Sequence, residues 1–334
     1  MNEVWVMAEQ FDGKLKEVSF ELLAWGRNLA DKMQVNLVSV LIGDGVNQNC
    51  LEGLINHGAD KVYSIQDREL KYFICEKYAG VLEKLINEYK PSIILAAATS
   101  SGRTLMPYVA IKVHAGLTAD CTELDIEEKT GNLLQTRPAI GGNIMATIKT
   151  PDHRPQIATV RPKSSKSLVP YESRKGEIKH IHYDCEDKKN VEVLCYKKED
   201  AGLQLDEADI IVAGGRGLKK AEHFTMITRL AQILKGAVGA SRDAVDRGWV
   251  SYPHQIGLSG KTVSPKVYIA AGISGAIQHL AGIKTSETII SINNDPEANL
   301  HKIADLAIVG DAFAVLPCLQ KRLLERLGDN NASL

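Results

Sequence analysis

The fold of this chain is decided by residues 210–311, a stretch that begins Ile210-Ile-Val-Ala-Gly-Gly-Arg-Gly217. Its first four residues are apolar, as in a strand buried on both faces, and a glycine-rich turn follows at once. Further apolar runs that end at glycine or at a short polar group lie at residues 236–239, 267–271, 288–292 and 306–309. Helical segments between such runs predict an α/β fold with a doubly wound parallel sheet, whose ligand lies across the carboxyl ends of the strands. We therefore expect a nucleotide-cofactor site in this half of the chain.

Length, composition and charge limit the class of protein. The chain has 334 residues, which suggests two domains, and 44% of them are apolar and 24% charged, as in an ordinary soluble protein. The net charge of −1, without a basic block, favours neither nucleic acid nor a membrane surface as partner. No window approaches the roughly 18 apolar residues of a membrane helix. The six cysteines are scattered singly, without metal-ligand spacing, so we expect a reducing cytoplasm and no metal site.

The first half of the chain predicts a second α/β unit. Buried strands separated by helices are expected at residues 4–8, 35–42, 61–65 and 93–97. The period then changes, and antiparallel strands are expected at residues 121–127, 133–137, 144–149 and 157–161. A charged, turn-rich segment near residues 185–205 marks the domain boundary. We expect residues 1–195 to form an N-terminal α/β domain with an antiparallel extension, and residues 196–334 to form the C-terminal domain.

A polar group at the start of a helix, Ser100-Ser101-Gly102, has two interpretations. Free backbone amides at a helix start bind anions. The same residues also cap a helix and form a tight turn, which is the more common role.

Several familiar catalytic and nucleotide motifs are absent. The glycine-rich turns contain no Gly-x-Gly-x-x-Gly, which disfavours a nicotinamide-type Rossmann site. Gly260-Lys261-Thr262 resembles the end of a Walker A motif, but Gln255 stands where the first glycine belongs. No nucleophile with an acid and a histidine suggests hydrolysis. We expect no catalytic residue, which disfavours an autonomous enzyme.

The remaining polar residues suit a large anion that carries a ring system. Gly272-Ile-Ser-Gly-Ala276 follows a buried strand and opens a helix, so its amides are placed for a pyrophosphate. Arg216 and Arg242 follow two other strands, and Asn293 and Asp311 stand as acceptors at the same predicted edge. An acidic side chain at such an edge often binds ribose hydroxyls.

A specific resemblance rests on motifs that run in order through residues 209–320. They are Gly214-Gly-Arg-Gly-Leu218, Gly236-Ala-Val-Gly-Ala-Ser-Arg242, Gln255-Ile-Gly257, Gly272-Ile-Ser-Gly-Ala-Ile-Gln-His-Leu-Ala-Gly282, Asp295-Pro-Glu-Ala298 and Ile308-Val-Gly-Asp311. Together they resemble the alpha subunit of electron transfer flavoprotein. The resemblance continues upstream through Gly116-Leu-Thr-Ala-Asp-Cys121 and Thr159-Val-Arg-Pro162.

The resemblance implies one FAD in the C-terminal domain. The residues that match family FAD contacts are Arg216, Ser241, Arg242, Gln255, Ile256, Gly257, Leu258, Ser259, Ser274, Gly275, Ala276, Ile277, Gln278, His279, Asn293, Asp311 and Ala312. Among them Arg242 matches the arginine over the flavin ring, His279 the group near the C2 carbonyl, and Ser259 the hydroxyl at N5. Ser259 and Leu258 replace the threonine and glutamine that are common in the family.

Two of these residues carry expectations about flavin tuning. The protein sets flavin potentials through the charges and hydrogen bonds around the ring, so Arg242 is expected to favour the reduced flavin. His279 is expected either to act as a pH-sensitive donor or to be a fixed neutral hydrogen bonder.

The resemblance also implies partners. We expect a heterodimer with an electron transfer flavoprotein beta subunit, which the N-terminal domain pairs with, and electron delivery to an acyl-CoA dehydrogenase-type flavoenzyme. The segment Gly141-Gly-Asn-Ile-Met-Ala146 resembles alpha subunits of anaerobes that bifurcate electrons from NADH to ferredoxin. The alternative is a non-redox nucleotide-binding regulatory or assembly protein.

Overall fold

The computed structural model of the chain describes residues 3–139, 144–182, 191, 193–195, 205 and 208–331. Residues 141–143 of the segment quoted above, and most of the boundary region expected at 185–205, lie outside this part. The contacts divide the chain into two units, Met1–Tyr196 and Lys197–Leu334, and each is described by itself.

The first unit is built on a seven-stranded parallel sheet with strand order β12-β5-β4-β1-β6-β11-β7. Its strands are β1 (Glu3–Ala8), β4 (Asn36–Gly43), β5 (Lys61–Gln66), β6 (Ile93–Ala97), β7 (Leu117–Cys121), β11 (Gln156–Val160) and β12 (Glu177–His180). The helices between them are α1 (Glu17–Met33), α2 (Gln48–Asn56), α3 (Cys75–Tyr89) and α4 (Ser100–Lys112), with the short pieces β2 (Gln10–Phe11), β3 (Lys14–Leu15) and η1 (Arg68–Leu70). Every residue of β1, β6 and β11 is buried, as expected for strands covered on both faces.

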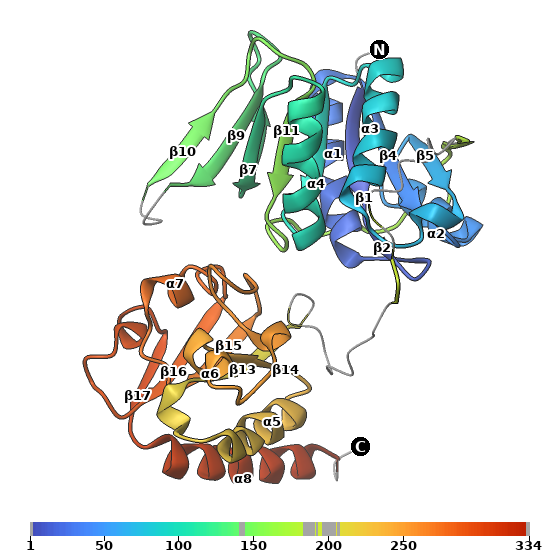
Figure 1. Cartoon of the computed structure of the whole chain (residues 1–334). Helices are drawn as coiled ribbons and strands as arrows, with labels where there is room; N and C mark the ends of the chain where they lie inside the picture. The colour runs from blue at the N-terminus through green and yellow to red at the C-terminus, as the bar shows by residue number, and fades with distance from the viewer. Residues whose placement is uncertain are drawn as a thin grey trace. The chain divides into compact units, whose positions relative to one another are not determined.

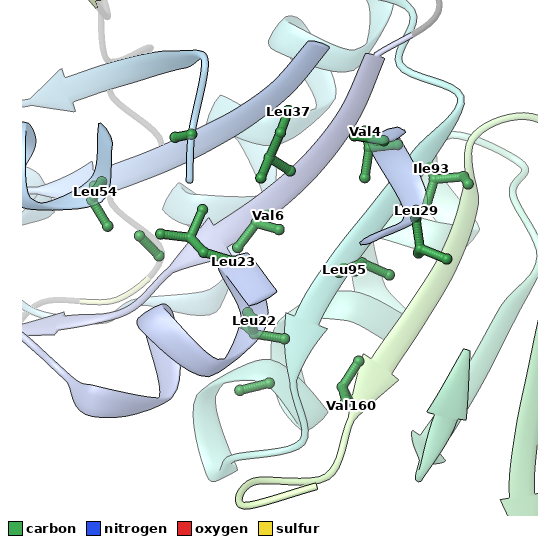
Figure 2. Close-up of a cluster of buried hydrophobic side chains, with 14 of the residues drawn as sticks. Val4, Val6, Leu22, Leu23, Leu29, Leu37, Leu54, Ile93, Leu95 and Val160 are labelled. Atoms are coloured by element: carbon green, nitrogen blue, oxygen red, sulfur yellow. The ribbon is translucent and has the colours of Figure 1, made fainter. Parts of the chain in front are cut away.

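Two apolar clusters hold the helices on this sheet. Leu22, Leu23 and Leu29 of α1 pack on β1, β4 and β6 (Figure 2), and α2 belongs to the same cluster. Helices α3 and α4 cover the opposite face.

One strand expectation was wrong. Residues 157–161 were expected to pair antiparallel, but β11 lies in the parallel sheet between β6 and β7. The antiparallel extension consists of β8 (Glu123–Ile126), β9 (Leu133–Pro138) and β10 (Met145–Ile148) alone. The cause is burial: β11 is covered on both faces, whereas the residues of β10 alternate between exposed and half-buried.

The second unit is a five-stranded parallel sheet with strand order β14-β13-β15-β16-β17 (Figure 1). Its strands are β13 (Ile210–Gly214), β14 (Ala237–Ala240), β15 (Val267–Ala271), β16 (Thr288–Asn293) and β17 (Leu306–Val309). Its helices are η2 (Arg216–Leu218), η3 (Ala221–His223), α5 (Phe224–Ile233), α6 (Arg242–Asp246), η4 (Tyr252–His254), α7 (Ile277–Leu280), η5 (Asn299–Lys302) and α8 (Ala312–Asn331).

The strand order of the second unit fixes where a ligand binds. The chain runs from β13 out to β14 and then crosses back to β15 on the other side of β13. The crevice at such a reversal, outside the carboxyl ends of β13 and β15, is the usual ligand site of an open α/β sheet. Helices α5 and α8 cover one face of this sheet, and short helices and loops cover the other. In the described part of the chain, no helix has the length and apolar character needed to cross a membrane.

Candidate functional site

One cavity of about 610 Å³ lies at the carboxyl ends of the strands in the second unit, a size within the roughly 300–1,000 Å³ of ordinary ligand sites. Its walls come from the segments that follow β13, β14, β15 and β16 and from the loop at residues 255–259. Ile256 N–H donates to the carbonyl of Ala240 (3.0 Å), which holds this loop against the end of β14. Twelve residues predicted from the sequence line the cavity: Arg216, Ser241, Arg242, Ile256, Gly257, Leu258, Ser259, Ser274, Ala276, Gln278, His279 and Asn293.

Glycine contacts bring the loops close enough to form this wall. Gly217 N–H donates to the carbonyl of Gly272 (2.9 Å), and a Cβ at Gly217 would lie 2.7 Å from the Gly272 Cα. Gly272 has φ +64°, a conformation that favours glycine. The loops after β13 and β15 therefore approach with backbone against backbone, and their polar groups face the cavity.

Two arginines line the cavity, and each lies beside an aspartate that also lines it. Arg216 and Arg242 are largely exposed, with 73% and 70% of their side chains accessible. Arg242 Nε lies 3.2 Å from Asp246 Oδ2, one helical turn further along α6, and Arg216 Nε lies 3.7 Å from Asp243 Oδ2. Exposed ion pairs of this kind contribute little to stability, so both guanidinium groups can turn toward a bound anion.

His279 is buried in the cavity wall and hydrogen-bonded at both ring nitrogens. Its Nδ1 lies 3.1 Å from the carbonyl oxygen of Ile256, and its Nε2 lies 2.9 Å from Tyr268 Oη. Burial lowers the pKa of His279 to about 4, although the bond to Ile256 opposes the shift. The imidazole is therefore neutral at physiological pH, and of the two interpretations the geometry supports the fixed neutral hydrogen bonder rather than the pH-sensitive donor.

The loop that carries Ser259 is held by hydrogen bonds from residues that do not line the cavity. Gln255 is 3% exposed, and its Nε2 donates to the Ser259 carbonyl (2.9 Å) and lies 3.1 Å from Ser259 Oγ. Tyr252 Oη donates to the same carbonyl (2.8 Å). Asn293, on the β16 side, is held by its Nδ2 bond to the Ile273 carbonyl (2.9 Å).

The structure does not bring every predicted residue to this cavity. Those that do not line it are Gln255, Gly275, Ile277, Asp311 and Ala312. Asp311 follows the edge strand β17, and its Oδ1 accepts a bond from Phe313 N–H (3.0 Å) at the start of α8. Ile277 points outward, with 77% of its surface exposed. In the first unit, the Thr99 side chain accepts from Gly102 N–H (3.2 Å) as the cap of α4, which is the capping role foreseen for this turn.

Seven lining residues were missing from the predicted set. They are Gly217, Asp243, Asp246, Gly272, Ile273, Asn294 and Asp295. A sequence signal existed for Asp246, because a carboxylate four residues after Arg242 on a helix is placed to pair with it. A signal also existed for Asn294 and Asp295, which belong to the polar group after β16, and Asp295 begins the Asp295-Pro-Glu-Ala298 motif.

Comparisons with known proteins decide the family. The model of the electron transfer flavoprotein domain matches residues 4–184, and that of the electron transfer flavoprotein FAD-binding domain matches residues 204–284. The electron transfer flavoprotein subunit alpha of Thermoanaerobacterium thermosaccharolyticum is 50% identical over 95% of this chain and 96% of its own length. The chain belongs to the electron transfer flavoprotein family, as an alpha subunit. Megasphaera elsdenii has a relative of the same description, 46% identical over 97% of both chains, and subunit LctC of a lactate dehydrogenase (NAD(+),ferredoxin) from Acetobacterium woodii is 42% identical over 94% of this chain and 75% of its own length.

Family membership assigns FAD as cofactor and implies a beta-subunit partner and electron exchange with other flavoenzymes. The residues present fit FAD. Arg216 suits its pyrophosphate and Arg242 its ring, and the close Gly217–Gly272 contact brings the loops after β13 and β15 together at the cavity. The imidazole of His279 is buried and neutral, with both ring nitrogens bonded within the protein, and so adds no charge to the cavity wall.

Proposed function

We propose that the cavity of the second unit holds the FAD and that its loops tune the affinity of the flavin for electrons. The observation that carries this proposal is that one cavity gathers twelve of the seventeen residues expected to contact FAD. Bound FAD supplies the electron-transfer chemistry, and the chain supplies binding, orientation and electrostatics.

Each polar group of the wall has a distinct role in this proposal. Arg242 places a positive charge beside the ring and so stabilises the reduced, more negative flavin. Arg216 and the amides that follow β15 hold the pyrophosphate. Ser259 donates a hydrogen bond to an acceptor atom of the ring, and His279, whose two ring nitrogens are bonded to Ile256 and Tyr268, packs beside the ring. No described side chain at the cavity combines a nucleophile with a general base, which suits an electron carrier.

We further propose that the chain works as a heterodimer that takes electrons from NADH and passes them to an acyl-CoA dehydrogenase-type flavoenzyme, with ferredoxin as a second acceptor. The names of two relatives support this. One is the lactate dehydrogenase (NAD(+),ferredoxin) subunit LctC, and the other is the acryloyl-CoA reductase electron transfer subunit beta of Anaerotignum propionicum, 40% identical over 95% of this chain. The N-terminal unit is the part that we assign to the beta-subunit interface. The FAD-binding domain match and the alpha-subunit relatives argue against the alternative of a non-redox nucleotide-binding regulatory or assembly protein.

The test is co-purification with the beta subunit, flavin counting and spectral titration with NADH, with and without ferredoxin, in the presence of an acyl-CoA dehydrogenase-type flavoenzyme with its acyl-CoA substrate as the other electron acceptor. Two FAD per heterodimer and NADH-dependent reduction of ferredoxin are expected. A complex that holds one FAD plus AMP and leaves ferredoxin oxidised would contradict the bifurcating assignment. It would leave the FAD assignment of this chain intact.

A further inference from the structure

We propose that Asp246 tunes the flavin: its carboxylate opposes the charge of Arg242 and keeps the flavin potential below the value that Arg242 alone would set. The inference rests on the proposed function, in which Arg242 lies beside the ring and Arg216 holds the pyrophosphate. Asp246 lines the same cavity as both arginines. A negative charge near the ring disfavours the reduced, more negative flavin.

The charged side chains that line the cavity do not, taken together, suit an anionic ligand. Two arginines stand against three aspartates, Asp243, Asp246 and Asp295. His279 adds no charge, because burial lowers its pKa to about 4. These two positive and three negative groups leave a formal charge of −1, although the pyrophosphate of FAD is itself negative. The aspartates therefore weaken the attraction of the cavity for FAD, and their contribution must lie elsewhere than in affinity.

The two aspartates of α6 differ in their partners. Asp243 Oδ2 lies 3.2 Å from Arg247 Nε and 3.7 Å from Arg216 Nε, so two guanidinium groups share its charge. Asp246 Oδ2 lies 3.2 Å from Arg242 Nε. No second cation in the part of the chain that the structure describes forms an ion pair with Asp246. Its charge is therefore set against that of Arg242 alone.

The position of each pair decides which property of the cofactor it affects. A charge shifts a redox potential only if it interacts differently with the oxidised and the reduced cofactor. The pyrophosphate is the same in both forms, so a charge beside it changes the affinity for both alike. The ring gains negative charge on reduction, so a charge beside the ring shifts the potential. Asp243 belongs to the pyrophosphate side through Arg216, and Asp246 belongs to the ring side through Arg242.

The geometry of the ring-side pair leaves Arg242 free to face the flavin at the same time. A guanidinium group has five N–H donors, and Asp246 accepts from Nε. The two terminal nitrogens of Arg242 have no hydrogen-bond partner among the described residues. Both side chains are largely exposed, 70% for Arg242 and 60% for Asp246, so solvent screens the pair. Displacement of this water by a bound cofactor strengthens the effect of both charges on the ring.

The experiment uses the heterodimer with its beta subunit and measures the flavin midpoint potential and the dissociation constant for FAD. Asp246→Asn removes the charge but keeps an oxygen that can accept from Arg242, and Asp246→Ala removes both. Asp243→Asn makes the same charge change in the same helix, on the pyrophosphate side. Asp209→Asn is the control, because its ion pair with Lys266 (2.8 Å) lies before β13 and β15, at their amino ends.

The expected result is a raised potential in both Asp246 variants. Each should favour the reduced flavin by about twofold to fivefold, the range of an exposed charge interaction, which raises the one-electron potential by about 20–40 mV. The rise should persist in the Arg242→Ala background, because the effects of two charges on the ring add. Asp243→Asn should tighten FAD binding by about twofold to fivefold with less than about half of this shift in potential. Asp209→Asn should change neither quantity.

Three results would overturn the inference. The first is a lowered potential in Asp246→Ala, which would mean that Asp246 holds Arg242 in place instead of opposing its charge. The second is an unchanged potential in both Asp246 variants while Arg242→Ala lowers it. The third is an equal shift in Asp243→Asn and Asp246→Asn. If Arg242→Ala also leaves the potential unchanged, the ring does not lie beside Arg242, and the proposed function itself fails.

Discussion

Gly217→Ala is the substitution that tests the architecture of the FAD cavity most sharply. The added Cβ would lie 2.7 Å from the Gly272 Cα and 2.9 Å from its carbonyl oxygen. Both atoms belong to the backbone, so no side chain can rotate away, and the loops after β13 and β15 must separate. Forcing an extra carbon into a packed contact costs about 1–3 kcal/mol.

The substitution therefore destabilises the packing of the two loops that bring Arg216 and Ser274 to the same cavity. If the whole of this cost opposes the FAD-binding arrangement, the dissociation constant for FAD rises by about fivefold to 150-fold. Flavin fluorescence during dilution or dialysis of the heterodimer measures this change. Gly310→Ala is the matched control, because its Cβ would lie 3.4 Å from a methyl group of Val315, an ordinary contact with a side chain that can move.

The prediction fails if Gly217→Ala and Gly310→Ala retain FAD equally well while both remain folded. Such a result would mean that the close contact between the two loops is not required for FAD binding.

The remaining predictions concern single side chains. Arg242→Ala should lower the one-electron potential of the flavin by about 60–130 mV, because a charge-assisted bond of about 1.5–3 kcal/mol is lost. The control Arg247→Ala, on the adjacent turn, should not lower it. Equal potentials of the two variants in a redox titration would contradict the role of Arg242. As the pH falls from 6.5 to 5, His279 becomes protonated in the unfolded chain but not in the folded chain, where its pKa is about 4. The free energy of unfolding of wild type should therefore fall by about 2 kcal/mol relative to that of His279→Gln. Equal changes in the unfolding free energy of the two proteins between pH 7.5 and 5 would exclude this. Ser291→Ala removes a buried hydroxyl that has no partner among the described residues and should leave the free energy of unfolding unchanged or raise it by about 1 kcal/mol, whereas a clear loss in urea unfolding would reveal a partner.

Sequence reasoning reached the layout of the second unit because buried parallel strands are continuous apolar runs. The strands at residues 267–271 and 306–309 coincide with β15 and β17, and glycine at the strand ends indicated where the cavity would lie. The polar residues gathered there followed from topology, since the carboxyl ends of parallel strands share one edge.

The predictions that were wrong or are still untested depend on information that the local sequence does not contain. A run such as residues 157–161 shows that a strand is present, but not whether its neighbours run parallel or antiparallel to it. Gln255 and Ser259 stand four residues apart in one loop, yet one side chain turns into the interior and the other lines the cavity. This difference between the two residues follows from the hydrogen bonds of the Gln255 amide to the Ser259 carbonyl and hydroxyl, which the structure shows and the sequence does not. The roles expected of the seventeen residues toward FAD remain predictions, including those of Gln255, Gly275, Ile277, Asp311 and Ala312, which do not line the cavity.

The most direct test of the account is an experimental structure of the heterodimer loaded with FAD. Flavin density is expected in the cavity between the loops after β13, β14, β15 and β16, with the ring within hydrogen-bond distance of Ser259, beside His279 and beneath the guanidinium of Arg242. An empty cavity in this chain, with FAD bound only elsewhere in a fully active complex, would contradict it.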